Sequence, residues 1–591
     1  MTLTRRTLLA SAGATVAVAA LPARAAQGAR DPKAVLDAIA EDHLRRFPSD
    51  ASELGVDVGP RAALRRRLTD KTPAGQQAIV EMLRRNLARA ATVDQASLDP
   101  ATRIHFDVVR TAYESALKGY GFGYGDVAVG GWRNTPYVVI QNVGSYIDAP
   151  KFLEATHKLE TRSDADAFLA RLTAWGGQLD GETERLRAAT SKGVVPPAFL
   201  LDKALNQLRI ARGGDPAGWS VVKALAAKYP AQAPAAARIV AARVVPALDR
   251  QVAALTEQRA RAGQDAGVWR LPDGPAYYRW ALQAATTTTR TPDEIHRQGL
   301  EELKALQAQM DAILRPLGYT KGSVGQRMQA LNRDPRFLFP ADDQGRAQII
   351  AFLERQLDAI RPKLPQAFGN PVKGLVEIRR IPVAEEPGAP GAYGGAGSLD
   401  GSIPGRFWIN LREPGAIPRF TLPTLAYHEA IPGHVWQGEY AFRLPLIRSL
   451  LAFSAYQEGW ALYAEQLADE LGMYAAEPVN RLGFLQGQAW RACRLVVDTG
   501  LHDKRWTRQQ AIAWFAEANG QEPGEVESEV DRYCAWPGQA CAYKIGHSEI
   551  VRLREATRAR LGDRFDTRGF NDSVVQAGPV PMTVLGRIVG G

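Results

Sequence analysis

Apolar residues recur at three- and four-residue spacing through much of this 591-residue chain. The pattern is clear in segments rich in Ala, Leu and Arg at residues 34–46, 78–91 and 164–172, and it returns at 292–317 and 344–364. Residues at this spacing share one face of an α-helix, so each segment predicts a helix with one buried face. We therefore expect a mainly α-helical protein.

Two segments depart from helical spacing. Residues 374–381 alternate in character and residues 406–411 are short and apolar, which predicts two strands of a small β-sheet. Between them, residues 387–405 contain seven glycines. No helix follows these glycines to receive a phosphate, so we interpret the run as a loop beside a cleft rather than a nucleotide-binding loop.

The N-terminus predicts an export signal over residues 1–25. Arg5 and Arg6 precede a small, apolar run at 10–21, and Ala23-Arg24-Ala25 has the form of a cleavage site. The run is too short to span a bilayer, so we expect no permanent membrane anchor. We interpret the segment as a twin-arginine signal, with the twin-arginine translocase as partner during export and a periplasmic or secreted location. An ordinary Sec signal is the alternative.

Charge and cysteine content exclude two further classes of protein. The formal net charge is only +10, and the 73 basic and 63 acidic side chains are interspersed, so we expect no nucleic-acid binding. Cys493, Cys534 and Cys541 fit neither a paired disulfide framework nor a zinc ribbon, and we expect them to be buried.

Chemistry is concentrated in the segment His428-Glu429-Ala430-Ile431-Pro432-Gly433-His434. It is similar to an HExxH zinc site lengthened by two residues. Histidines six apart diverge by about 120° on an unbroken helix, but the ring of Pro432 would collide with the carbonyl of residue 428. We therefore expect the helix to break at Pro432-Gly433, so that His428 and His434 converge on one Zn²⁺ ion. The alternative is a kinked helix with an ordinary surface histidine.

A third ligand is expected in the segment at 454–465. Ser454 and Gln457 have capping-box spacing, which would place Glu458 in the first turn of a new helix. Packed against the first helix, Glu458 would present its carboxylate to the same ion. Glu465 shares its face of the helix, and it would either support a ligand or replace Glu458 as the ligand.

These residues resemble the domain of unknown function 885 family, whose hallmarks are the HEAIPGH stretch at 428–434 and the EGWALYAE stretch at 458–465. The similarity extends over nearly all of the mature chain, including residues 47–51 and 536–546. Many members have a second histidine where this chain has Val435, so the ligand role falls on His434.

That family is similar to helical zinc peptidases such as thimet oligopeptidase, angiotensin-converting enzyme and thermostable carboxypeptidase. The resemblance implies two helical lobes around a deep cleft, with a small sheet near the active site. Residues 26–315 would form an N-terminal helical region and residues 316–591 a C-terminal catalytic region, as one continuous unit. The sheet, at residues 407–411, would offer an edge to extended peptides.

The implied activity is zinc-dependent hydrolysis of small peptides. His428, His434 and Glu458 would hold the metal, Glu429 would act as general base, and Tyr543 would stabilise the developing oxyanion. The alternatives are a metal-dependent amidase acting on a non-peptide or cell-wall amide, and a non-catalytic periplasmic binding protein.

Four further residues are candidates for contacting the substrate. Gln539, Lys544 and His547 are spaced along a predicted helix with Tyr543, and Lys544 would suit a substrate carboxylate. His502 follows Asp498 by four residues, so the two would either pair with each other or reach the cleft.

Overall fold

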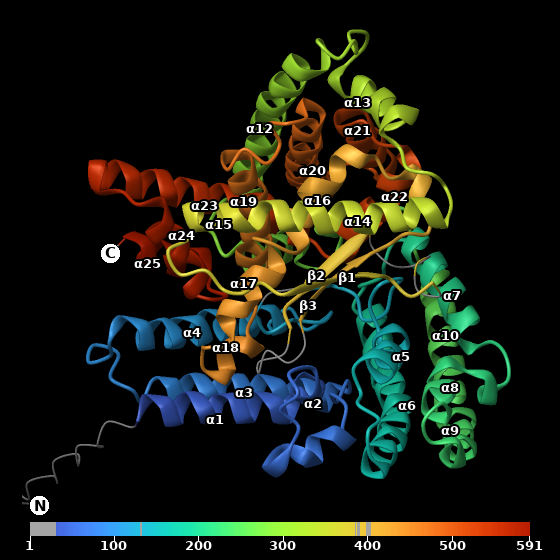
Figure 1. Ribbon diagram of the computed structural model, residues 1–591. Helices are drawn as coiled ribbons and strands as arrows, with labels where there is room; N and C mark the ends of the chain where they lie inside the picture. Colours follow the sequence, from blue (N-terminus) through green and yellow to red (C-terminus); the bar gives the residue numbers. More distant parts are fainter. Residues whose placement is uncertain (1–30, 131–132, 384–385, 387–390, 398–403, 591) are drawn as a thin grey trace, which may run out of the picture.

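The computed structural model describes residues 31–590 except 131–132, 384–385, 387–390 and 398–403. The predicted export signal at 1–25 and much of the glycine-rich run at 387–405 therefore lie outside the described residues. The described chain is mainly helical with one small sheet (Figure 1), as the sequence predicts.

Most helices of the N-terminal half begin where the sequence supplies a proline or a capping side chain. Thr161 and Thr291 each form a capping box with the acidic residue three positions later. These helices are α1 (Pro32–Arg46), α2 (Pro48–Glu53), α3 (Pro73–Ala90), α4 (Pro100–Tyr120), α5 (Ser145–Ala155), α6 (Arg162–Ser191), α7 (Ala198–Arg212), α8 (Ser220–Ala226), α9 (Ala233–Ile239), α10 (Val245–Arg259), α11 (Gly274–Thr286) and α12 (Pro292–Leu314).

The second half contains the sheet and a further set of helices. These helices are α13 (Val324–Asn332), α14 (Asp343–Ile360), α15 (Leu364–Ala367), α16 (Leu422–Glu429), α17 (His434–Ala441), α18 (Leu446–Leu450), α19 (Ser454–Glu470), α20 (Pro478–His502), α21 (Arg508–Asn519), α22 (Pro523–Ala535), α23 (Gln539–Leu561), α24 (Thr567–Gln576) and α25 (Met582–Gly590).

The sheet has three strands in the order β1-β3-β2. Strand β1 (Val376–Arg380) pairs in parallel with β3 (Gly405–Ile409), and β2 (Ala392–Gly395) pairs antiparallel with the other side of β3. The expectation that residues 407–411 offer a free edge is therefore wrong, because β3 has a hydrogen-bonded neighbour on each side. Strand β2, which lies within the glycine-rich run, is an edge strand instead.

Two large hydrophobic cores and one small cluster, of Leu44, Ala51 and Leu64, stabilise the described chain. The smaller of the two large cores is formed by helices α5 to α10 and is built from residues between 138 and 255. The larger one joins α1, α3 and α4 to the helices of the second half, and it contains the three buried, unpaired cysteines. Packing crosses residue 315, because α12 packs along α20.

Helix α19 lies at the centre of the larger core. It packs along α23 and against α16 and α17, and Trp460 and Tyr463 on it are completely buried. Its backbone approaches that of α23 closely, since a Cβ on Gly459 would lie 2.5 Å from the carbonyl carbon of Gly546. Side chains on α19 are therefore held in fixed positions relative to both neighbours. None of the described helices is long and apolar enough to cross a membrane.

Candidate metal centre

The helix carrying the histidine motif breaks where the sequence predicts. Helix α16 ends at Glu429 and α17 begins at His434. Glycine is required inside the break, because a Cβ on Gly433 would lie 1.8 Å from the carbonyl oxygen of His428. The two imidazole rings converge as a result, with ring centroids 5.0 Å apart and planes at 88°.

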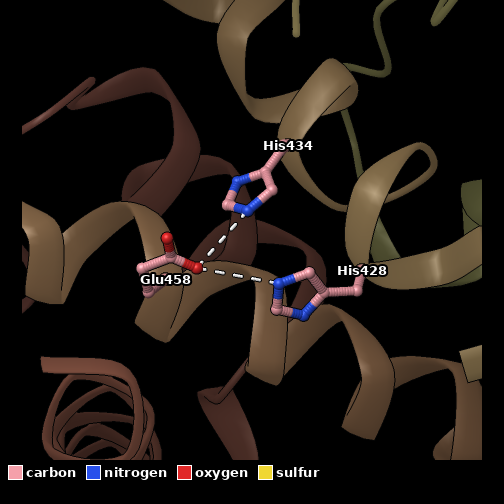
Figure 2. Close-up of side chains that lie close together, drawn as sticks. All are labelled: His428, His434 and Glu458. Carbon is pink, nitrogen blue, oxygen red and sulfur yellow. Dashed lines mark ion pairs between the residues drawn. The ribbon is translucent and has the colours of Figure 1, made fainter. Parts of the chain in front are cut away.

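Glu458, on α19, completes a set of three candidate ligands (Figure 2). Its Oε2 atom lies 3.7 Å from Nε2 of His428 and 3.5 Å from Nε2 of His434. The three ligand atoms all lie within 4.8 Å of one another. Two imidazole nitrogens and one carboxylate are a donor set that suits Zn²⁺ and leaves a coordination position open. The residues present therefore fit the metal that the motif implies.

Helix α19 does not begin as the sequence predicts. Phe453 is the N-cap residue, no side chain caps the helix, and Ser454 is its first residue. The predicted capping box at Ser454 and Gln457 is therefore wrong. The side chain of Ser454 instead accepts a long hydrogen bond from Gln539. The wrong capping prediction does not affect the candidate site, because Glu458 still faces α16.

Glu465 lies on the other side of the His428 ring. Its Oε1 atom is 2.7 Å from Nδ1 of His428, while its Oε2 accepts a 3.0 Å hydrogen bond from Gln488. Glu465 is completely buried. The sequence left open which of the two carboxylates is the third ligand, and the geometry distinguishes their roles. Glu458 faces both Nε2 atoms, whereas Glu465 contacts Nδ1 of His428 and orients its ring.

The carboxylates of Glu458 and Glu465 stabilise a positive charge on His428. Burial alone lowers the pKa of His428, but hydrogen bonds to Glu458 and Glu465 outweigh it and raise the pKa to about 9. Burial opposes ionisation of Glu458, yet the hydrogen bonds to both histidines hold its pKa well below the ordinary value. Without metal, His428 is therefore in its positively charged form, and this charge lies where the metal cation would bind.

The ligands line a cavity of ≈1730 Å³. Glu429 also lines it and is 8% exposed. Strand β2 covers this side of the cavity, because a Cβ on Gly394 would lie 2.1 Å from the carbonyl oxygen of Glu429. The residue predicted to act as a base thus lies beside both the ligands and an edge strand.

Tyr543, on α23, lines the same cavity and is half-buried. The guanidinium of Arg494 lies 4.3 Å from the centroid of its ring. The close contact between Gly459 and Gly546 places Tyr543, one turn before Gly546, beside the segment that carries Glu458. A phenol in this position has access to groups bound near the ligands.

The other candidate substrate contacts are not among the residues that line this cavity. Lys544 is buried, and its Nζ lies 2.9 Å from Oε1 of Gln488 and 3.0 Å from Oε2 of Glu302. His547 is buried as well, with Nε2 2.8 Å from Oε1 of Gln466. Gln539 is buried and accepts a 2.6 Å hydrogen bond from Arg532.

His502 and Asp498 neither pair with each other nor line the cavity. His502 accepts a hydrogen bond from the backbone amide of Val268 through Nδ1, and its Nε2 lies 3.0 Å from the carbonyl oxygen of Tyr533. Asp498 accepts hydrogen bonds from the Tyr278 hydroxyl and the Gly538 amide. Both side chains therefore connect helices within the core.

Sequence reasoning missed a group of charged residues that also line the cavity, namely Arg133, Arg494, Glu529 and Arg532. One signal was present in the sequence: Arg494 interrupts an otherwise apolar helical stretch that includes Leu495, Val496 and Val497. An arginine within such a stretch must be paired or serve a site, because burial of an unpaired charge is costly.

Comparison with known proteins gives matches over nearly the full length. A structure titled as that of the "putative lipoprotein" from Colwellia psychrerythraea is 33% identical, with a TM-score of 0.88 over 94% of this chain and 98% of that one. A second, of a "putative lipoprotein of unknown function" from Shewanella oneidensis, is 18% identical with a TM-score of 0.71, over 95% and 100% of the two chains, and is similar in fold.

No curated protein matches the sequence. The family model described as "Bacterial protein of unknown function (DUF885)" matches residues 48–589, which include the histidine motif, Glu458 and Tyr543. The chain therefore belongs to the DUF885 family.

Proposed function

We propose that this protein is a zinc-dependent peptidase that hydrolyses small peptides. The observation that carries the proposal is the convergence of His428, His434 and Glu458, with ligand atoms within 4.8 Å of one another. Support comes from Glu465 behind His428 and from Glu429, which follows the first ligand directly and lines the same cavity. A purely structural cluster needs neither an open cavity nor an additional carboxylate beside it.

Each residue of the site has its own role in the proposed hydrolysis. Zn²⁺ bound by the three ligands supplies a Lewis acid that activates water and polarises the scissile carbonyl. Glu429 takes a proton from the attacking water and later delivers it to the leaving nitrogen. Tyr543 donates a hydrogen bond to the oxygen that gains negative charge. Glu465 keeps a proton on Nδ1 of His428, so that Nε2 presents its lone pair.

The cavity favours short substrates. Its volume of ≈1730 Å³ exceeds the roughly 300–1,000 Å³ of typical small-molecule pockets, which suits a peptide of a few residues. We propose that the substrate lies in a cleft between two helical lobes, with its backbone extended along β2, the edge strand above Glu429.

The proposed location is outside the cytoplasm. Two full-length structural relatives carry the word lipoprotein in their names, which supports an extracytoplasmic protein. The Arg5-Arg6 pair and the apolar run that follows support export by the twin-arginine translocase, which carries folded proteins. Such a route suits an enzyme that acquires its metal before export.

Metal analysis combined with a peptide-library digest tests the function. The protein without its export segment, and its Glu429→Gln variant, should each retain about one zinc per chain, because all three ligands survive. Only the unmodified protein should cleave peptides. Equal cleavage by both would remove Glu429 from the mechanism, and metal binding without hydrolysis in either would support a binding protein instead.

A further inference from the structure

We propose that Arg494 and Arg532 form a binding site for a substrate carboxylate, so that the preferred substrates are peptides with a free carboxylate close to the scissile bond. The inference rests on the proposed peptidase function and names the class of peptide that the site selects. Three observations carry it: a buried guanidinium with an unused donor, an excess of positive charge, and the position of both in the cavity that the candidate metal ligands line.

Arg494 is buried but incompletely paired. It lies on α20, lines the cavity, and is 8% exposed. Its Nη2 donates a 2.9 Å hydrogen bond to Glu529 and its Nε donates a 3.0 Å bond to the Tyr533 hydroxyl. Nη1 is buried and has no hydrogen-bond partner within the described part of the chain. A buried charged donor without a partner is costly, and native proteins retain such groups where a ligand, an ion or an ordered water completes them.

The local charge is unbalanced. Arg532 also binds Glu529, through Nε at 3.1 Å and Nη2 at 2.9 Å, so two guanidinium groups share one carboxylate. The excess is that of Arg494 and Arg532 over Glu529. Arg133, which has interactions of its own, lies with its guanidinium 4.6 Å from the Trp536 ring, against which Arg532 also packs. An anionic group entering the cavity would neutralise this excess, and a carboxylate matches the geometry of a guanidinium.

Arg494 and Arg532 line the same cavity as the candidate metal ligands, and a chain of intervening contacts lies between them. The Arg494 guanidinium covers the ring of Tyr543 at 4.3 Å. Tyr543 lies one turn before Gly546, which contacts Gly459, the residue after the ligand Glu458. Arg133 also interacts electrostatically with both Tyr543 and Glu458. We therefore expect a peptide whose carbonyl reaches the metal to place its carboxylate-bearing end toward Arg494.

Paired peptides test the inference. The substrate set comprises one short peptide with a free C-terminus, its C-terminal amide, and an amide whose last residue is Glu. We expect the unmodified zinc enzyme to cleave the free acid with a kcat/KM at least about tenfold above that for the neutral amide. The amide lacks the carboxylate, so it loses the charge-assisted pair with Arg494 in the desolvated cavity. The Glu amide shows whether a side-chain carboxylate serves as well as a terminal one.

Arg494→Gln should reduce the ratio of acid to amide cleavage to near one, whatever its effect on the absolute rate for each peptide, because Arg494 also packs on Tyr543. Arg250→Gln is the matched control, because Arg250 pairs with Asp180 at an exposed position and should leave the ratio unchanged. Circular dichroism checks folding. If Arg494→Gln does not fold, Arg494→Lys replaces it, and the ratio measured for the unmodified enzyme still decides the question.

A binding measurement separates the two proposals. Calorimetry with the Glu429→Gln variant should show tighter binding of the acid than of the amide, and adding Arg494→Gln should abolish the difference. Equal cleavage and equal binding of acid and amide by the unmodified Arg494 site would overturn the carboxylate site and leave the peptidase standing. Absence of cleavage of every peptide would overturn the peptidase, while a persisting preference in binding would still support the carboxylate site.

Discussion

Oε1 of Glu465 lies 2.7 Å from Nδ1 of His428, on the opposite side of the ring from Glu458. Because an ionised carboxylate only accepts hydrogen bonds, Nδ1 carries the proton of a neutral His428, and Nε2 is left with its lone pair toward the cavity. This contact thus fixes the rotation of a proposed ligand before any metal arrives, and its tautomer once Nε2 has lost its proton.

Glu465→Gln should weaken zinc binding by about 10- to 100-fold without abolishing it, because a residue that supports a ligand is lost while all three ligands remain. Competition with a fluorescent chelator measures the affinity. Glu470→Gln, farther along the same helix and paired with Arg554, is the control and should bind zinc normally. Unchanged affinity in Glu465→Gln would show that this contact does not orient the ring.

Glu458→Gln should reduce zinc content more than Glu465→Gln does, since an amide is a poor replacement for a ligating carboxylate. Elemental analysis after dialysis against a weak chelator distinguishes the two variants. The reverse order of metal loss would identify Glu465 as the ligand and contradict the proposed coordination.

Gly459→Ala should lower the free energy of unfolding by about 1–3 kcal/mol or more, because its Cβ would overlap the backbone of Gly546 and force α19 and α23 apart. Gly177→Ala is the control: Gly177 is in α6, a Cβ there would meet nothing within 4 Å, and alanine favours the helix by about 1 kcal/mol. Urea unfolding measures both. Equal effects would mean that α19 and α23 tolerate separation.

Lys544→Met should lower the free energy of unfolding by about 3–5 kcal/mol, because it leaves Glu302 and Gln488 without their buried partner. KM for peptides should change little, since Lys544 does not line the cavity. A large increase in KM at unchanged stability would instead return Lys544 to the substrate site that the sequence suggested.

His502 should make stability depend on pH. Burial lowers its pKa to about 4, against a hydrogen bond to Tyr533 that raises it. Between pH 6.5 and 4 the unfolded chain binds a proton there that the native protein does not, so the contribution of His502 is complete above pH 6.5 and falls as the pH falls. Relative to His502→Gln, the metal-free protein should lose about 2–3 kcal/mol between pH 7 and 4.5. Urea unfolding measures both proteins at each pH. An equal change in the free energy of unfolding for the unmodified protein and His502→Gln between the two pH values would contradict this.

Local sequence features predicted the helices and the break well. Residues 34–46, 292–317 and 344–364 lie largely within α1, α12 and α14, because their apolar spacing is a property of the segment itself. The break at Pro432-Gly433 follows from the covalent limits of those two residues. The strands at 374–381 and 406–411 are also present, as β1 and β3.

Features that depend on distant contacts were missed. Strand β2 is a glycine-rich segment with no strand propensity of its own, and it forms because β3 offers hydrogen bonds. Lys544 and Tyr543 are adjacent in sequence, but one faces Gln488 in the core and the other the cavity. Helical spacing alone cannot say which face of α23 meets α20, so the packing of Arg494 on Tyr543 could not be anticipated.

Because α16 and α17 are separate helices, metal affinity depends on how the helices of the protein are packed together. In an unbroken four-residue motif, even an isolated helical peptide holds both imidazoles at the right separation. Here the two rings belong to different helices and the carboxylate to a third, so the donor atoms meet only when those helices are docked. Zinc bound at the proposed site would therefore discriminate sharply between native and loosely packed forms, and saturating metal should raise the melting temperature of this protein by mass action.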